Sequence, residues 1–279
     1  MNIANAIYGI EQRAAEAIKA EQGDYIKDGL LHCGKCNTPK QTRIILFGKE
    51  RTPMCLCKCA IEQRDKEEAE RKRIEFERTV KRLRQAGFPE SKMEDWTFAS
   101  ADGENEKIIT VAKNYVENFS QMKKDGKGLL LFGTVGTGKT FVSACIANAL
   151  IDKGYGVLMT NFARIANTVQ GMFEGKQEYY DSFNRFPLLI LDDLSAERKT
   201  EYMQEIVYNV IDARYQAGLP LIVTTNLTSD ELKHPADVTN QRTFSRLFEM
   251  CIPLQVEGID RRRDKLKDAH EKYKGILGY

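Results

Sequence analysis

Short apolar runs alternate with segments that carry apolar residues at helical spacing over the second half of the chain. The runs lie at 128–132, 157–161, 187–192 and 219–226, and the helical segments lie at 141–151, 162–173 and 200–217. Continuous apolar runs such as 188–191 are typical of strands that are covered on both faces, as in a parallel sheet. The pattern therefore predicts an α/β fold in which helices flank a parallel sheet.

The first third of the chain has a different pattern. Apolar residues at helical spacing over 3–21 predict an amphipathic helix, which either packs on its own domain or docks on a partner. Residues 60–85 carry a charge at almost every second position, which predicts a long, solvent-exposed helix that ends near Gly87 and Pro89. We therefore expect a small N-terminal domain at 1–59, a helical linker at 60–86 and a large domain at 87–279.

Charge and composition narrow the function only slightly. The chain has 42 basic and 40 acidic residues and a net charge of +2, so a nucleic-acid-binding surface has to be a local patch. No run reaches the roughly 18 apolar residues of a membrane span, and the N-terminus lacks a signal-peptide pattern. These features predict a soluble, cytoplasmic protein without a membrane partner. Seven cysteines in such a protein favour metal ligands or buried thiols over disulfides, and Cys145 and Cys251 stand in apolar segments where we expect them to be buried.

A complete phosphate-binding motif follows the first apolar run. Residues 133–140 read GTVGTGKT, and a helical segment comes directly after them. Glycines let backbone N–H groups turn towards phosphate oxygens, and the helix presents the positive end of its dipole to the same anion. Lys139 is expected to reach the β- and γ-phosphates, and the Thr140 hydroxyl to ligate Mg²⁺. The residues expected at the nucleotide are Gly133, Gly136, Thr137, Gly138, Lys139, Thr140 and Phe141. The alternative is a glycine turn that merely begins a helix.

Two aspartates lie at the end of the third apolar run. Asp192 is the last residue of 187–192, and Asp193 follows directly. A strand that ends in carboxylates is the usual second half of an ATP site, because one carboxylate orients Mg²⁺ and the next polarises the attacking water. We assign Asp192 to magnesium and Asp193 to the water. The alternative is that the pair only forms a turn.

Five cysteines and a histidine cluster between residues 32 and 59. Cys33 and Cys36 form a CxxC knuckle, and the second half of the cluster, CLCKC, follows a predicted hairpin at 44–47. Four thiolates around Zn²⁺ leave no position for water, so the predicted metal is structural, and in so small a segment it supplies about 10 kcal/mol or more of folding free energy. We favour Cys33, Cys36, Cys57 and Cys59 as ligands, with Cys55 as the alternate. His32 is expected to point away, and a redox CxxC is the competing interpretation.

Several of these motifs together resemble one known family. The phosphate loop, LLILDD at 188–193, IVTTN at 222–226, TFSRL at 243–247 and GIDRR at 258–262 look like an AAA+ ATPase of the DnaC/DnaI helicase-loader type. The resemblance covers roughly 88–265, and versions encoded by phages look especially close. It extends to the layout, since many such loaders carry a small N-terminal domain, often zinc-binding, that grips the replicative helicase.

The resemblance implies roles for further residues. Asn226 would be the sensor at the γ-phosphate, and Arg246 the arginine finger that completes the neighbouring subunit's site, with Arg242 as a competitor. Arg262, or otherwise Arg261, would be the second sensor. Asp193 departs from the family, which commonly has glutamate there, and the shorter carboxylate implies slow hydrolysis that suits a switch.

The function that the resemblance implies is ATP-dependent loading of a hexameric replicative helicase onto single-stranded DNA, with self-association through the ATP site. Loops or the basic cluster at 261–267 would contact DNA, although that cluster is equally a solvated helix face. Base stacking and core packing are alternatives for a set of aromatic residues, which are Phe162, Phe173, Tyr179 and Tyr180. Two other hypotheses remain, an ATPase partner of a transposase on duplex DNA and a zinc-stabilised scaffold with a degenerate nucleotide site.

Overall fold

The computed structural model describes residues 20–88, 90–101, 103, 105–194, 200–235, 237–260, 273–274 and 276–278. The chain divides into two compact units, the first unit up to Glu77 and the second unit from Arg78 onwards. The amphipathic helix expected at 3–21 lies outside the described residues, apart from 20–21. In the described part of the chain, no helix combines the length and the apolar character that a membrane crossing requires.

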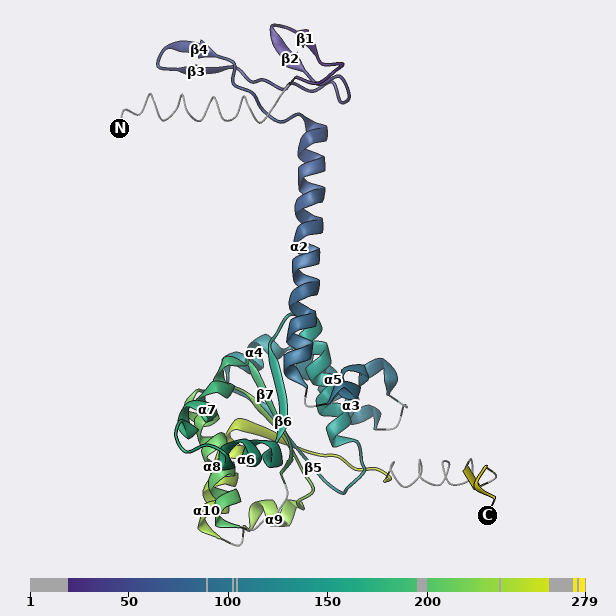
Figure 1. The fold of residues 1–279 in the computed structure, drawn as a ribbon, viewed down its shortest axis with the longest axis vertical. Helices are drawn as coiled ribbons and strands as arrows, with labels where there is room; N and C mark the ends of the chain where they lie inside the picture. The colour runs from purple at the N-terminus through teal and green to yellow at the C-terminus, as the bar shows by residue number, and fades with distance from the viewer. Residues whose placement is uncertain are drawn as a thin grey trace. The chain divides into compact units, whose positions relative to one another are not determined.

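From residue 20 onwards, the first unit contains two hairpins and the first part of a long helix (Figure 1). Strands β1 (Tyr25–Lys27) and β2 (Leu30–His32) pair antiparallel, as do β3 (Ile44–Leu46) and β4 (Lys49–Arg51). The two turn residues of each hairpin, Asp28–Gly29 and Phe47–Gly48, have positive φ, the geometry of tight two-residue hairpins. Helix α2 (Lys58–Gly87) then carries the charged segment, as its pattern predicts. The division of the chain at 59 and 86 stays a prediction.

A five-stranded, fully parallel sheet forms the centre of the second unit. Its strands are β5 (Gly128–Phe132), β6 (Val157–Asn161), β7 (Leu188–Leu194), β8 (Leu221–Thr225) and β9 (Cys251–Gln255). They lie in the order β6-β7-β8-β5-β9, so consecutive strands are joined by crossovers. The predicted parallel sheet is therefore confirmed.

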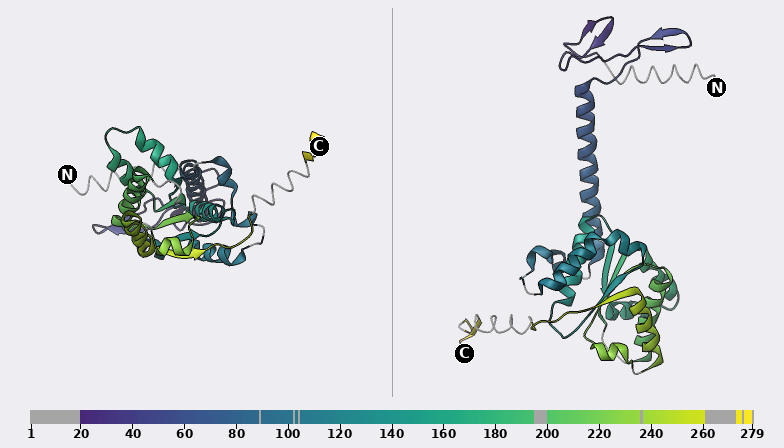
Figure 2. Two further views of the ribbon diagram at one scale, coloured as in Figure 1. Left: turned by 90° about the horizontal axis from the view of Figure 1, so that it is seen from below. Right: turned by 180° about the vertical axis from the view of Figure 1, so that it is seen from behind.

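Helices cover both faces of this sheet. They are η1 (Ser91–Asp95), η2 (Phe98–Ser100), α3 (Glu106–Glu117), α4 (Phe119–Lys124), α5 (Lys139–Asp152), α6 (Phe162–Gln170), α7 (Lys176–Ser182), η3 (Phe183–Arg185), α8 (Glu201–Gln216), α9 (Ser229–Lys233) and α10 (Val238–Met250). Helices α3 and α5 share one hydrophobic cluster with the sheet, while α6, α8 and α10 share the other (Figure 2). Side chains of β5, β7 and β8 enter both clusters, which is why these strands read as continuous apolar runs.

Two details differ from the expected elements. The helix expected at 162–173 ends at Gln170, and the exposed Phe173 stands between α6 and α7. Strand β7 does not end at Asp192 but continues to Leu194, so the aspartates lie inside the strand and not at its end. Cys145 and Cys251 are buried, as expected for small apolar side chains.

Candidate nucleotide and metal sites

The phosphate loop connects β5 to α5 and has the backbone geometry that its glycines predict. Gly133, Gly136 and Gly138 all have positive φ, a conformation that side-chain-bearing residues rarely adopt. Lys139 is only 7% exposed, and its Nζ donates to the carbonyl oxygens of Gly133 and Thr134 at 2.8 and 2.7 Å. The loop thus presents a cradle of backbone N–H groups at the start of α5, with an ammonium group folded onto it, which fits a phosphate chain. Thr137 is buried beside it, and Phe141 follows on α5.

Two distant segments lie against this loop. One surrounds Asn105, which no motif indicated, and the other, 256–260, overlaps the GIDRR motif that the resemblance implies for the second sensor. A Cβ at Gly133 would lie 2.5 Å from the Val256 carbonyl oxygen, and one at Gly136 would lie 2.0 Å from the Asp260 carboxylate. The Asn105 side chain donates to the Thr137 carbonyl oxygen at 3.3 Å. The chain after β9 therefore runs beside the loop as far as Asp260, while Arg261 and Arg262 lie outside the described residues.

Asp192 lies next to the phosphate loop. The Thr140 hydroxyl donates to its two carboxylate oxygens at 2.9 and 3.1 Å, and the Thr224 hydroxyl donates to Oδ1 at 2.7 Å. Burial raises the pKa of the Asp192 carboxyl above its usual range, and the hydroxyl hydrogen bonds oppose that rise. A hydroxyl and a carboxylate oxygen facing each other beside the loop are the donor types that Mg²⁺ takes, so these residues fit the ion.

Asp193 has a left-handed backbone, with φ of 59°, at an irregularity in the pairing of β7 with β8. Asn226 Nδ2 donates to the Asp193 carboxylate at 3.3 Å. Aspartate is among the few side-chain-bearing residues that adopt the left-handed region readily, whereas glutamate has no such preference. The local backbone therefore gives a physical reason for aspartate at this position.

Arg246 lies on α10 and points towards α8 of its own chain. Its guanidinium pairs with the Asp212 carboxylate at 2.8 Å and lies 4.6 Å above the ring centre of Tyr208. The side chain is 23% exposed. Its competitor Arg242 is exposed on the same helix. An intersubunit role for Arg246 stays a prediction, and it requires the guanidinium to leave Asp212.

Cys33, Cys36, Cys57 and Cys59, called the cysteine cluster below, meet in the first unit. Their Sγ atoms all lie within 4.8 Å of one another, and the Cys33–Cys59 and Cys57–Cys59 pairs are 3.6 and 3.4 Å apart. Sulfur atoms of a tetrahedral zinc site with 2.3 Å bonds are about 3.8 Å apart. The four thiols therefore fit a zinc ion.

Residues around the cysteine cluster explain this choice of thiols. Cys55 Sγ instead faces the Pro39 carbonyl oxygen, and His32 Nδ1 contacts the Leu30 carbonyl oxygen.

A hydrogen bond with the Thr38 hydroxyl lowers the pKa of Cys36, a thiol of the cysteine cluster, to about 5. Hydrogen bonds with the neighbouring thiols, first of all Cys57, raise the pKa of Cys59 to about 12. Crowding four thiolates without a cation is unfavourable, and a bound metal removes that cost.

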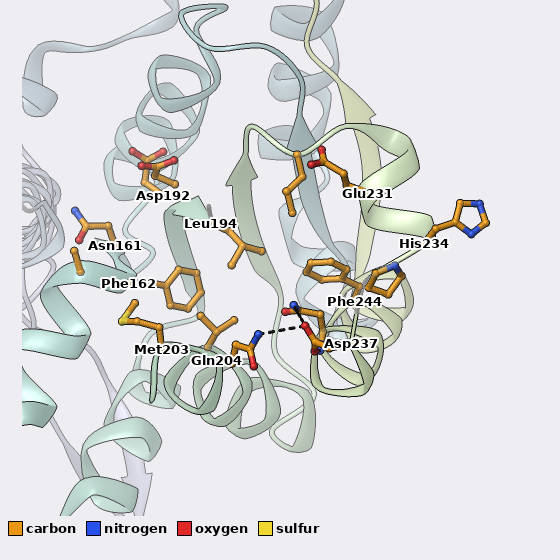
Figure 3. A pocket seen from close by; sticks show the side chains of 16 residues that line it. Asn161, Phe162, Asp192, Leu194, Met203, Gln204, Glu231, His234, Asp237 and Phe244 are labelled. Carbon is orange, nitrogen blue, oxygen red and sulfur yellow. Dashed lines mark hydrogen bonds between the residues drawn. The ribbon is translucent and has the colours of Figure 1, made fainter. Parts of the chain in front are cut away.

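A cavity of about 380 Å³ lies beside the aspartates on the α8 face of the sheet (Figure 3). Phe162, Leu194 and Met203 give it an apolar lining, and Gln204 Nε2 donates to Asp237 at 3.2 Å at its edge. Of the aromatic residues considered for base stacking, Phe162 and Tyr180 are buried, Tyr179 packs on the core and Phe173 is fully exposed.

A family model for IstB-like ATP binding protein matches residues 61–267, which is most of the chain. The chain belongs to the IstB-like ATP binding protein family. The match includes the phosphate loop, both aspartates, Asn226 and Arg246, and it begins inside α2, after the cysteine cluster.

Relatives of this IstB-like chain include curated helicase loaders. It is 29% identical over 161 residues to the replicative helicase loader DnaI of Bacillus subtilis, covering 53% of this chain and 51% of that protein. It is 25% identical over 130 residues to the replicative helicase loader DnaC of Escherichia coli K12, covering 44% and 51%. The chain thus spans about half the length of these relatives. A putative insertion sequence ATP-binding protein of Sinorhizobium fredii is 34% identical over 106 residues, or 36% of this chain and 34% of that one.

Crystal structures show the same fold as this IstB-like chain. A DnaI structure matches with a TM-score of 0.53 and 24% identity, covering 64% of this chain and 99% of that one. A structure of the DnaC helicase loader matches with a TM-score of 0.52 and 22% identity, covering 60% and 100%. The expected AAA+ fold and the resemblance to DnaC and DnaI are therefore confirmed.

Proposed function

We propose that this chain is an ATP-dependent loader of a hexameric replicative helicase onto single-stranded DNA in the cytoplasm. The observation that carries the proposal is that the phosphate loop, Asp192, Asp193 and Asn226 meet at one edge of the sheet. Curated relatives of this chain are named as replicative helicase loaders. Nucleotide state would set how long subunits associate and hold the helicase, so the output is an assembly state.

Each residue of the site has a role in this proposal. Lys139 would release its carbonyl partners and donate to phosphate oxygens. Thr140 and Asp192 would hold Mg²⁺, which neutralises charge during phosphoryl transfer. Asp193, aligned by Asn226, would orient a water molecule and accept its proton.

Arginines would link hydrolysis to assembly. Arg246 would leave Asp212 and reach the triphosphate of a neighbouring subunit, which makes completion of the site depend on self-association. Arg262, two residues beyond Asp260, is assigned to the nucleotide of its own subunit. Because Asp193 carries a shorter side chain than glutamate, we assign slow ATP hydrolysis that assembly or DNA stimulates.

The first unit is assigned to the helicase. A zinc ion in the cysteine cluster would fix the two hairpins, which display apolar side chains such as Ile26, Ile45 and Phe47 with more than three-quarters of their surface exposed. We assign these exposed apolar side chains to the helicase contact, since apolar surface is typical of protein interaction sites where it is continuous. The helix α2, over 60–86, would serve as the linker.

Loading of helicase onto single-stranded DNA should depend on Lys139. Lys139→Ala removes the ammonium group from the phosphate loop, and we expect loss of ATP binding and of loading, with zinc content unchanged. Lys124→Ala, which removes an exposed lysine on α4, is the matched control and should bind and load normally. Unchanged loading by Lys139→Ala would favour a scaffold whose nucleotide site is degenerate.

The family match and the Sinorhizobium relative favour a second candidate, an ATPase partner of a transposase on duplex DNA. Pull-down with a hexameric replicative helicase in ATP separates the two. A complex with helicase supports the loader. Absence of that complex, together with filament formation on duplex DNA, would contradict the loader and support the transposase partner.

A further inference from the structure

Strand β7 contains one residue more than its partner β8 at the candidate ATP site. Leu191 pairs with Val223 and Leu194 pairs with Thr225, so Asp192 and Asp193 together lie opposite a single residue, Thr224. This is a β-bulge, an uncommon feature in a parallel pair. Bulges re-aim side chains and are over-represented next to active sites.

The bulge has a visible effect on where side chains point. Leu191 and Leu194 both enter the hydrophobic cluster on the α8 face, although strict alternation would send the second of them to the opposite face. Asp192 faces α5, where it meets Thr140. The extra residue, Asp193, is thereby freed from both packed faces and takes the left-handed backbone that places its carboxylate near Asn226.

At the bulge, the Thr224 hydroxyl takes the place of a backbone acceptor in the hydrogen bonding between β7 and β8. The Asp193 N–H donates to Thr224 Oγ1 at 2.8 Å, and the same hydroxyl donates to Asp192 Oδ1 at 2.7 Å. Thr224 is 2% exposed, so water does not compete for these bonds. A hydroxyl can accept one hydrogen bond while donating another, whereas the side chain of valine, alanine or leucine can do neither.

We propose that Thr224 is a positioning residue that sets both carboxylates of the site at once. It holds Asp192 in the orientation that meets Thr140, and it fixes the bulge that aims Asp193 at Asn226. The proposal rests on the proposed function of the nucleotide site. It adds Thr224 of β8 to the residues that the sequence motifs assign to that site.

Thr225 provides the comparison on the same strand. Its hydroxyl donates to the Leu194 carbonyl oxygen and accepts from the Leu227 N–H at 3.1 Å, on the opposite face of the sheet. Thr225 therefore makes the same kind of bonds at the same bulge, but neither of them reaches an aspartate. A substitution at Thr225 reports the structural cost of a lost hydroxyl without the positioning effect.

The test compares Thr224→Val, Thr224→Ser and Thr225→Val in the full chain, with two readouts. The first readout is ADP affinity, measured in EDTA and at increasing Mg²⁺ concentrations. It gives the Mg²⁺ concentration at which half of the increase in ADP affinity is reached. Thr224→Val should raise this concentration by about tenfold to a hundredfold, the equivalent of one hydrogen bond to a charged group, and leave ADP affinity in EDTA unchanged. Thr224→Ser should match the wild type, and Thr225→Val should keep the wild-type Mg²⁺ dependence.

The second readout needs no ligand. Hydrogen exchange of the Asp193 amide should be about tenfold faster in Thr224→Val than in wild type or Thr224→Ser, because its acceptor is gone. If the valine variant does not fold, Thr224→Ala removes the same hydroxyl with a smaller side chain and is read in its place. Folded hydroxyl-free variants with wild-type Mg²⁺ dependence would overturn the proposal while leaving the function intact. Failure of the wild type to bind any nucleotide would instead contradict the proposed function.

Discussion

In the described part of the first unit, only Cys33, Lys40 and Cys57 are buried, whereas in the second unit hydrophobic clusters cover both faces of a five-stranded sheet. These described residues thus form almost no apolar interior, and two of the three buried residues belong to the cysteine cluster. Segments this small rarely bury enough apolar surface to fold alone. We therefore expect metal ligation by the cysteine cluster to replace a hydrophobic core in the first unit, whereas the second unit has a core of its own.

Polar contacts in the first unit do not make up the difference. Lys40 and Asp24 form a buried ion pair at 2.7 Å, and the Lys40 hydrogen bond lowers the pKa of Asp24 to about 2. Asp24 also accepts from the Gly34 N–H, beside the first cysteine of the cluster. Buried ion pairs contribute little net stability because desolvation offsets their attraction, so this pair orients the knuckle more than it stabilises the fold.

The largest expected effect is the loss of zinc. Cys33→Ser, or chelation of the wild type, should unfold the first unit, because structural zinc supplies about 10 kcal/mol or more in segments of this kind. Metal content and amide exchange in 20–57 measure the loss, while the main thermal transition, from the second unit, should not move. Cys55→Ser is the matched control, since Cys55 lies outside the cysteine cluster, and it should keep one zinc per chain. A shared loss of both units, or zinc well below one equivalent in wild type purified without chelators, would break the comparison.

The stability of the second unit should depend instead on its buried polar network. Arg214, on α8, is 1% exposed and donates to the carbonyl oxygens of Phe183, Pro187 and Pro220, tying together the starts of β7 and β8. Burial lowers its pKa to about 10, so it stays charged near neutral pH. Arg214→Met leaves buried acceptors unpaired and should lower the free energy of unfolding by about 3 kcal/mol. Denaturant unfolding measures the change in the second unit, and zinc content should not change.

A matched arginine controls for the loss of charge. Arg185 is exposed at the end of η3, just before the start of β7, and Arg185→Met should stay within about 0.5 kcal/mol of the wild type. Equal effects of the two substitutions would show that the buried network of the second unit carries no special weight.

The sequence predicts this site well where chemistry is local. Glycine positions and a lysine at fixed spacing define the phosphate loop, and the apolar runs define the strands, because both depend on neighbours along the chain. Cysteine spacing likewise favours the four thiols that the structure groups.

Contacts between distant segments could not be predicted from the sequence. The bulge at Asp192 and Asp193 depends on the register of β7 against β8, which no local pattern encodes. Asp212, the partner of Arg246, and Asp260, beside the phosphate loop, come close only through the crossover connections of the sheet. A threonine pair at the end of an otherwise apolar strand was the available sequence signal for Thr224, since buried hydroxyls require partners.

The smallest effect separates the roles of the two units in function. Ile45 and Phe47, at the tip of the second hairpin, are 80% and 78% exposed, and we expect them to contact the helicase. Ile45→Thr combined with Phe47→Asn removes these apolar contacts but suits the backbone, because threonine favours strands and asparagine favours the left-handed conformation of residue 47, where φ is 50°. Capture of a hexameric helicase should weaken by about 2 kcal/mol, or roughly thirtyfold, with zinc content and nucleotide binding unchanged.

Lys49→Ser is the matched control for that double variant, since it alters an exposed polar residue of the same hairpin and should leave capture within a factor of about two. Because asparagine at residue 47 relieves backbone strain, the double variant should fold at least as well as the wild type. A loss of capture then comes from the removed surface, not from unfolding. Unchanged capture by the double variant would place the helicase contact outside this hairpin and remove the assigned reason for a zinc-held first unit.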